Sequence, residues 1–383
     1  MRIGVIGCGQ FMSRQHIQTI HRSPGLELHH LADLNRTALD RVAARYAPAR
    51  TSTDWRAVIQ DPQVELVVAG VVPTLHPEIV RASVAAGRPL YVEKPVTATL
   101  AEGQELQRLA DQHACAVAVG FNRRFAPATA LVRQAFAAAS GPVSIFYRIS
   151  DDDRVRPPAQ NWKKADRLLV EVVHIFDLLH HLVGAEPVQV HTVEARFNDA
   201  LVTMSFADGS RGTILSSSYG SMAQCKERLE AVLDHGAVEM DDFVEVRTHG
   251  LKGLPERACF AGRPYDDCDN AHVKAFAERG VEACLALRQR YAAAMERSGV
   301  LADSGDAAAW QRFAAMSGDP PWPQINYCQD KGWGAALVSF CDAVGRGALP
   351  VNAGLADINR ATACAEAGRE SIVTGKPVRL SPG

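Results

Sequence analysis

The sequence predicts two domains: a doubly wound α/β domain built on a parallel sheet, followed by an α+β domain with a large, mostly antiparallel open sheet. The chain has 383 residues, more than the roughly 100 to 200 that one globular core usually holds. Residues 2–120 alternate short β-branched runs with longer helical patterns, which is typical of βαβ units. From about residue 141 the strand patterns follow one another, and turns such as Asp208-Gly209 favour hairpins.

The first domain is expected to end at residue 122 and to alternate strands with helices. Its strands are expected at residues 2–7, 26–32, 64–72, 89–92 and 116–120. Its helices are expected at residues 13–22, 36–46, 77–86 and 100–113. Because a right-handed crossover joins parallel strands, this order predicts a doubly wound sheet.

The second domain is expected to span residues 123–383. Its strands are expected at residues 142–150, 188–196, 201–206, 211–217, 228–233 and 237–240. A strongly patterned helix at 168–183 interrupts them, and residues 251–328 are expected to form a helical insertion. Two last helices, at residues 334–345 and 355–374, are expected to return to the first domain.

Composition and charge exclude several classes of protein. Lys and Arg total 41 against 43 Asp and Glu, so no basic field favours a nucleic-acid partner. The nine cysteines are scattered without a CxxC pair, which argues against a disulfide framework and a zinc site. Because we find neither a secretory signal pattern nor an apolar run long enough to span a bilayer, we expect a cytoplasmic protein without a membrane partner.

A glycine-rich turn, Gly7-Cys8-Gly9-Gln10-Phe11-Met12, follows the first strand and opens a helix. In this context backbone N–H groups can approach a pyrophosphate, with the first glycine making the turn and the second admitting the phosphate. Met12 stands where the pattern has a third glycine, so the helix must find another packing against the strand. The residues expected to contact a dinucleotide here are Gly7, Gly9, Gln10, Phe11 and Met12.

Asp33 ends the second strand, where a carboxylate can accept hydrogen bonds from an adenosine ribose and repel a 2′-phosphate. This position favours NAD as the cofactor. Arg36 lies three residues later and is able to pair with a 2′-phosphate, so NADP stays open as an alternative.

Four further segments carry a resemblance to a known family. They are residues 72–76, 91–96, 120–125 and 208–210, with the sequences VPTLH, YVEKPV, GFNRRF and DGS. In this order they resemble the glucose-fructose oxidoreductase and inositol dehydrogenase family, called Gfo/Idh/MocA, and the Glu-Lys-Pro motif is its most specific mark. The resemblance covers most of the chain and weakens between about residues 251 and 328. It implies an NAD(P)-dependent oxidoreductase acting on a secondary alcohol or ketone of a sugar, cyclitol or related polyol.

Lys94 is the first candidate for a catalytic residue. Oxidation of a secondary alcohol removes the hydroxyl proton while a hydride leaves carbon, so a base must lie within hydrogen-bond reach of that hydroxyl. Lys94 follows a parallel strand at the sheet edge where such folds bind ligands, and Pro95 helps to orient it. The remaining residues expected at the cofactor are Pro73, Thr74, His76, Glu93 and Asn122.

The helix at residues 168–183 carries a polar stripe on an otherwise apolar surface. At 100° per residue, Glu171, His174, Asp177 and His181 fall within about 120° of one another. The resemblance assigns proton transfer and substrate binding to His174 and an acid role to Asp177. Many relatives have an aspartate where this chain has Val170, and Glu171, one position later, resembles the Glu-x-x-His version of the motif.

The expected catalytic residues are therefore Lys94, His174, Asp177 and Glu171. The substrate is expected to contact Lys94, Arg123, Trp162, Asp177 and His174. No metal is expected, because no second Glu-x-x-His helix occurs to complete a metal-binding bundle.

Two other classes of function remain open. The first is a catalytically silent dinucleotide-binding sensor or regulator, and the loss of the aspartate at Val170 keeps it possible. The second is an NAD-using enzyme that oxidises its substrate only transiently, as glycosidase- or epimerase-like enzymes do. In each case an exposed sheet of this size favours a homodimer or homotetramer.

Overall fold

The computed structural model describes residues 1–152, 165–266, 269–300, 306–318 and 326–381. The chain divides into two compact units. Unit 1 comprises Met1–Phe125 and Gly332–Glu366, and unit 2 comprises Ala126–Lys331 and Ala367–Gly383.

Unit 1 is built on a six-stranded sheet whose order is β3-β2-β1-β4-β5-β6. Its strands are β1 (Arg2–Ile6), β2 (Glu27–Ala32), β3 (Arg50–Ser52), β4 (Leu66–Ala69), β5 (Leu90–Val92) and β6 (Val117–Val119). Every neighbouring pair is parallel, which confirms the predicted doubly wound sheet. The sequence pattern missed the edge strand β3, because three residues without a buried side chain carry no hydrophobic period.

Helices and short helical turns connect the strands of unit 1. They are α1 (Gln10–Met12), the π-helical turn η1 (Ser13–Ile17), α2 (Gln18–Arg22), α3 (Arg36–Tyr46), α4 (Arg56–Gln60), the 3₁₀ turn η2 (Pro73–Leu75), α5 (His76–Ala85), α6 (Leu100–Gln112) and the 3₁₀ turn η3 (Asn122–Phe125). The strand expected at 64–72 ends earlier, at Ala69, because Pro73 begins the 3₁₀ turn. As a result Val72, which the pattern placed in a buried strand, is 65% exposed.

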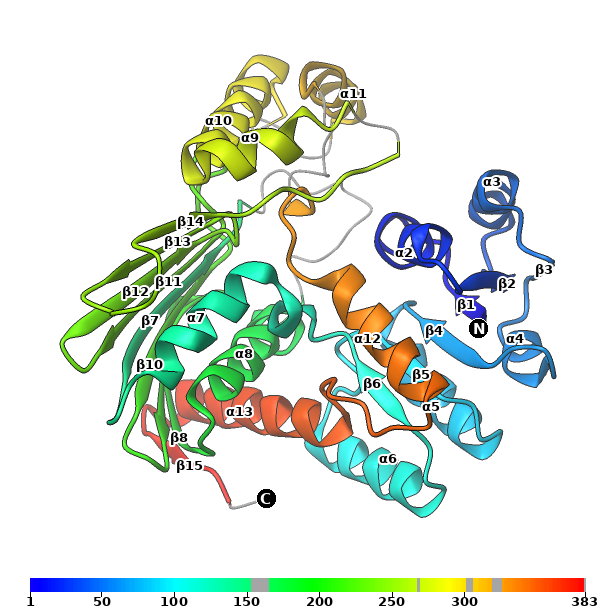
Figure 1. The fold of residues 1–383 in the computed structure, drawn as a ribbon, viewed down its shortest axis with the longest axis horizontal. Coiled ribbons are helices and arrows are strands. Elements are labelled where there is room, and N and C mark those ends of the chain that lie inside the picture. Colours follow the sequence, from blue (N-terminus) through cyan, green and yellow to red (C-terminus); the bar gives the residue numbers. More distant parts are fainter. Residues whose placement is uncertain (153–164, 267–268, 301–305, 319–325, 382–383) are drawn as a thin grey trace. The chain divides into compact units, whose positions relative to one another are not determined.

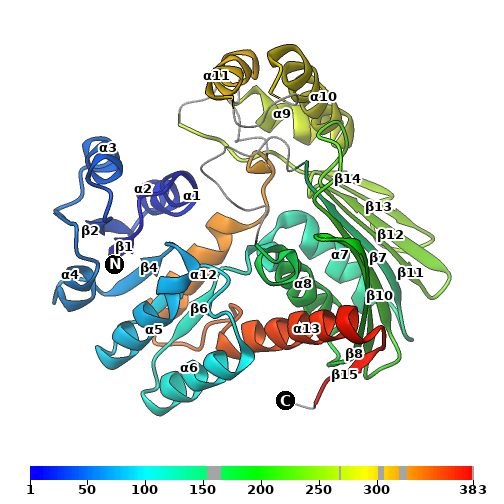
Figure 2. The same cartoon turned by 180° about the vertical axis from the view of Figure 1, so that it is seen from behind.

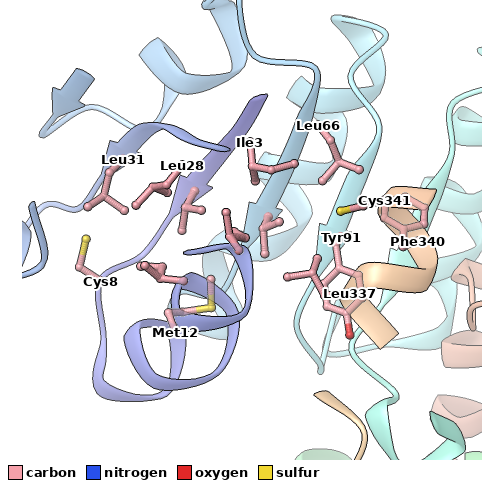
Figure 3. Packing of buried hydrophobic residues seen from close by; sticks show 14 of the residues in the cluster. Ile3, Cys8, Met12, Leu28, Leu31, Leu66, Tyr91, Leu337, Phe340 and Cys341 are labelled. Atoms are coloured by element: carbon pink, nitrogen blue, oxygen red, sulfur yellow. The ribbon is translucent and has the colours of Figure 1, made fainter. Parts of the chain in front are cut away.

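The core of unit 1 combines the sheet with a helix from the far end of the chain. Helix α12 (Trp333–Gly345) brings Leu337 and Phe340 against Tyr91 of β5, and Ile3 and Leu66 lie in the same cluster (Figure 3). The apolar residues of α12 thereby cover sheet surface that residues 1–125 leave open.

A glycine directly after β4 takes over the packing role of the glycine missing from the first turn. A Cβ at Gly70 would lie 2.2 Å from Sδ of Met12, so Gly70 leaves the space that the Met12 side chain fills. Gly7 has a φ of +108°, and a Cβ there would lie 2.2 Å from the carbonyl oxygen of Gly70. The first turn therefore needs glycine at residue 7, while Gly70 provides the close helix–strand packing.

Unit 2 contains a nine-stranded sheet in the part of the chain that the structure describes, in the order β14-β13-β12-β11-β7-β10-β9-β8-β15. Its strands are β7 (Ser144–Ser150), β8 (Pro187–Arg196), β9 (Asp199–Phe206), β10 (Arg211–Ser217), β11 (Glu227–Leu233), β12 (Gly236–Asp241), β13 (Glu245–His249), β14 (Arg257–Cys259) and β15 (Val378–Arg379). The pairing of β7 with β10 is parallel and the other pairings are antiparallel. This confirms the mostly antiparallel sheet.

Besides the end of α13 (Leu355–Thr374), the described part of unit 2 contains two groups of helices. Figures 1 and 2 show α7 (Pro127–Ala137) and α8 (Val173–Val183) on one face of the nine-stranded sheet. The second group follows β14 and consists of α9 (Ala271–Arg279), α10 (Val281–Ser298) and α11 (Ala307–Met316). Residues of α10 and α11 form a small apolar core of their own, centred on Tyr291, Met295 and Phe313.

The other face of the nine-stranded sheet carries exposed apolar side chains. Phe146, Leu201 and Val232 are 38%, 46% and 60% exposed, and they alternate along their strands with buried residues. Such a face is compatible with the expected oligomer, which stays a prediction. Among the residues described, no helix has both the length and the apolar character needed to cross a bilayer.

Replacing Gly70 by alanine is expected to destabilise unit 1 by about 1–3 kcal/mol, because the new methyl group overlaps the Met12 side chain. Chemical denaturation measures the change in the free energy of unfolding. Gly345→Ala is the matched control, since its Cβ would meet only the terminal methyl of Met1, at 3.4 Å. Equal stability of the two variants would contradict this account of the packing.

Candidate functional site

The glycine turn and Asp33 are held together by hydrogen bonds. The backbone N–H of Cys8 donates to Oδ2 of Asp33 over 2.6 Å, and the N–H of Asn35 donates to Oδ1 over 2.7 Å. A Cβ at Gly9 would have no atom within 4 Å. The turn thus has open space in front of a helix amino terminus, which fits the phosphates of a dinucleotide.

The structure separates the two residues that bear on the choice of cofactor. Asp33 lies at the end of β2 beside the glycine turn, whereas Nε of Arg36 pairs with Oδ1 of Asp40 over 2.8 Å on α3. Arg36 and Asp40 are both exposed. Burial, together with the charge of Asp33, raises the pKa of the Cys8 thiol to about 12, so this cysteine stays protonated.

Two exposed apolar residues at the same edge were missed by sequence reasoning. Leu34 follows β2 and is 79% exposed, and Val72 follows β4 and is 65% exposed. These strands lie on either side of β1 in the sheet. The sequence did contain a signal for Leu34. It is a large apolar residue directly after Asp33, at a position where an exposed loop would favour a polar residue.

Glu93 makes a buried pair with a histidine that sequence reasoning did not single out. Nε2 of His16 lies 2.7 Å from Oε1 of Glu93, and both side chains are almost completely buried. A Cβ at Gly120 would lie 2.6 Å from the Glu93 carboxylate, so the glycine at the end of β6 makes room for it. Glu93 is thereby fixed one residue before Lys94, which is partly buried.

A second buried histidine holds the other side of Lys94. Nδ1 of His76 lies 2.7 Å from the carbonyl oxygen of Pro95, and the N–H of Val71 donates to Nε2 over 3.3 Å. Because Nε2 accepts this hydrogen bond, Nδ1 carries the proton and donates to Pro95. Burial lowers the pKa of His76, which favours the neutral ring that these two bonds require.

Two 3₁₀ turns of unit 1 carry the other residues expected at the cofactor, together with Arg123, which is expected at the substrate. Pro73 and Thr74 are exposed in η2, directly after the end of β4. Asn122 and Arg123 are buried in η3, which follows β6. Both turns follow strands at the carboxyl edge of the sheet, as does Lys94.

In unit 2, the expected helix at 168–183 is present but its first turn differs. Residues Leu168–Val172 form the π-helical turn η6, and α8 continues from Val173. The assumed 100° spacing therefore does not apply to Glu171, because a π-turn has more residues than an α-turn. His174 and Asp177 lie on α8 and are 5% and 4% exposed.

Glu171 belongs to a cluster of four charged side chains. Nζ of Lys226 lies 2.8 Å from Oε1 of Glu171 and 3.1 Å from Oδ1 of Asp151, and Nη1 of Arg167 lies 2.8 Å from Oδ2 of Asp151. The sequence did not reveal Lys226, Asp151 or Arg167, because they are distant from the Glu-x-x-His motif or outside its pattern. Trp162 lies outside the described residues.

One group of potential metal ligands occurs in the described part of unit 2. Cys225, Asp242 and Cys284 are buried with their ligand atoms within 4.8 Å of one another. Nη2 of Arg288 lies 2.8 Å from Oδ2 of Asp242, so a protein cation already neutralises this carboxylate. The arrangement therefore disfavours a divalent ion at this position.

Comparison with protein families supports the resemblance found in the sequence. The family model GFO_IDH_MocA, described as an oxidoreductase family with an NAD-binding Rossmann fold, matches residues 1–121. The myo-inositol dehydrogenase Hyg17 of Streptomyces leeuwenhoekii is 31% identical over 195 residues, which are 50% of this chain and 58% of that protein. The uncharacterized oxidoreductase YrbE of Bacillus subtilis is 22% identical over 72% of this chain and 85% of its own.

Solved structures share the fold over the whole chain. Levoglucosan dehydrogenase in complex with NADH and levoglucosan aligns with a TM-score of 0.71 at 20% identity, covering 100% of both chains. The myo-inositol dehydrogenase of Lactobacillus casei in complex with NAD(H) and myo-inositol aligns with a TM-score of 0.70 at 15% identity, covering 100% of this chain and 97% of that one. Residues 1–121 therefore match an oxidoreductase family with an NAD-binding Rossmann fold, and the whole chain shares the fold of these solved structures.

Proposed function

We propose that this protein is a dehydrogenase that transfers a hydride between NAD(P) and a secondary alcohol or ketone of a sugar, cyclitol or related polyol. The observation that carries the proposal is the setting of Lys94. It follows β5 at the carboxyl edge of the parallel sheet, with Glu93 held by His16 before it and Pro95 held by His76 after it. A lysine fixed in this way is suited to act as a base.

The cofactor would be held by the turn around Gly7 and Gly9, with Asp33 accepting hydrogen bonds from the adenosine ribose. Leu34 and Val72 would make apolar contacts with the adenine ring, since both are exposed apolar groups at this edge of the sheet. Pro73, Thr74 and Asn122 would line the path toward the nicotinamide. When bound, NAD supplies the hydride acceptor, chemistry that protein side chains lack.

The substrate hydroxyl would lose its proton to Lys94, and His174 would also take part in proton transfer. Asp177 and Glu171 would orient neighbouring hydroxyls, because carboxylates accept strong hydrogen bonds from them. Arg123 and Trp162 would complete the substrate contacts. The similarity to inositol dehydrogenases and to a levoglucosan dehydrogenase favours polyhydroxylated rings as substrates.

Lys94→Ala is expected to lower kcat/KM for the best substrate by at least about 100-fold, because the hydroxyl proton loses its acceptor. NADH or NADPH absorbance, followed with a panel of sugars and polyols, measures the rate. Lys376→Ala replaces an exposed lysine and serves as the control.

Each result of this panel separates the candidate functions. Undiminished turnover by Lys94→Ala would remove lysine from the mechanism. Cofactor binding without any turnover by the wild-type protein would favour the catalytically silent sensor. Valine at position 170, where many relatives have an aspartate, is the sequence feature that supports this alternative. Tightly retained cofactor with substrate conversion but no net NADH would favour transient oxidation.

Wild-type protein is expected to bind NAD at least about fivefold more tightly than NADP, a difference of about 1 kcal/mol. Asp33→Asn keeps an oxygen for the Cys8 N–H but removes the charge that repels a 2′-phosphate, so it should reduce this preference. Calorimetric titration measures both affinities without a substrate. Glu27→Gln, on the same strand, is the control, and a wild-type preference for NADP would contradict the role given to Asp33.

His16→Ala is expected to lower stability by about 1.5–3 kcal/mol, because the buried Glu93 carboxylate loses a hydrogen bond. It should also lower kcat more than it changes NAD affinity, since Lys94 would lose its fixed position. Denaturation and steady-state kinetics provide the two readouts. The control is His21→Ala, which removes an exposed histidine from α2, and a wild-type kcat in His16→Ala would show that Lys94 needs no support from this pair.

A further inference from the structure

Helix α10 is anchored to the nine-stranded sheet by a buried ion pair. Arg288 of α10 is 1% exposed, and its Nε and Nη2 lie 2.9 and 2.8 Å from Oδ2 of Asp242, which is completely buried. A buried charge is stable only when a partner compensates it, so α10 cannot leave this position without exposing or isolating both groups.

Asp242 in turn holds the beginning of β11. Its Oδ2 accepts a hydrogen bond from the backbone N–H of Lys226 over 3.0 Å, and its Oδ1 accepts one from the N–H of Glu227 over 2.8 Å. A second buried pair fixes the same place, because Nζ of Lys331 lies 2.6 Å from Oε1 of Glu227. Arg288 of α10 and Lys331, which follows residues 251–328, are therefore both tied to residues 226–227.

The side chain of Lys226 extends from this anchored backbone to Glu171 and Asp151. Burial alone would lower the pKa of Lys226, but surrounding carboxylates outweigh it and hold the pKa above its usual value. These carboxylates are Asp151, Glu171 and Glu227, and the Arg167 charge opposes them. Lys226 therefore stays charged, and its ammonium fixes Glu171 three residues before His174.

We propose that Lys226 is a positioning residue for Glu171 and the helix that carries His174, and that helix α10 holds Lys226 in place through Arg288 and Asp242. This inference rests on the proposed function only for its effect on catalysis. Three successive contacts connect α10 with Glu171 inside unit 2. Arg288 donates to Asp242, Asp242 accepts a hydrogen bond from the backbone N–H of Lys226, and the Lys226 ammonium contacts Glu171. Helix α10 thus acts as a support for the helix that carries His174.

Steady-state kinetics of Lys226→Gln test the first part. Its kcat should fall about tenfold to 100-fold, with NAD affinity unchanged, because misplaced catalytic groups lose their alignment. Its pH profile should also move, with the acidic limb at higher pH, since Glu171 would lose the cation that stabilises its charged form. Lys226→Arg should restore most of the rate, and Lys274→Gln, at an exposed lysine of α9, should change nothing. An unchanged kcat and pH profile in Lys226→Gln would overturn the proposal.

Hydrogen–deuterium exchange of α8 tests the link between α10 and α8 without any substrate. Both Arg288→Met and the milder Arg288→Lys should speed exchange in residues 173–183, and adding Lys226→Gln should produce little further change, because the two sites share one chain of contacts. Two results together would refute the link. Exchange in residues 173–183 would be unchanged by Arg288→Lys, and the effects of Arg288→Met and Lys226→Gln on this exchange would add in the double variant. Because this readout needs no turnover, it stands even if no polyol is oxidised, a result that would contradict only the proposed function.

Discussion

Carboxylates buried away from water require a partner, and this requirement determines where the chemically important residues of both units lie. In unit 1, Glu93 is matched by His16, and the pair fixes the backbone beside Lys94. In unit 2, Asp242 is matched by Arg288, and its remaining acceptor capacity fixes the backbone of Lys226. In each unit a buried acid is both paired with a polar side chain and used as a support.

Space is the second constraint on unit 1. The glycine turn lacks the third glycine of its pattern. The helix and the sheet still pack closely, because Gly70 has no side chain and leaves the space that the Met12 side chain fills. Gly120 plays the corresponding role for the Glu93 carboxylate. The glycines that allow this close packing therefore lie directly after strands as well as in the glycine turn itself.

The sequence pattern predicted long, periodic elements well and short ones poorly. The helices at Arg36–Tyr46 and Leu355–Thr374 have the bounds that their apolar spacing indicated. The strands β3, β14 and β15 were missed, because two or three residues are too few to show a period of two, and the five-residue β13 was missed as well. Helix α7 was also missed, since its apolar pattern falls just after the expected end of the first domain.

By itself, the sequence determined the order of motifs along the chain: a glycine turn after the first strand, Asp33 after the second, Lys94 after a later one, and a polar stripe on one helix. These are local features, and strand order carries the first three to the same edge of the unit 1 sheet. Only the tertiary structure decided which partners hold them. His16 and Glu93 are 77 residues apart, Glu171 and Lys226 are 55, and Asp242 and Arg288 are 46. Such pairs depend on how strands and helices pack, and no local pattern encodes that packing.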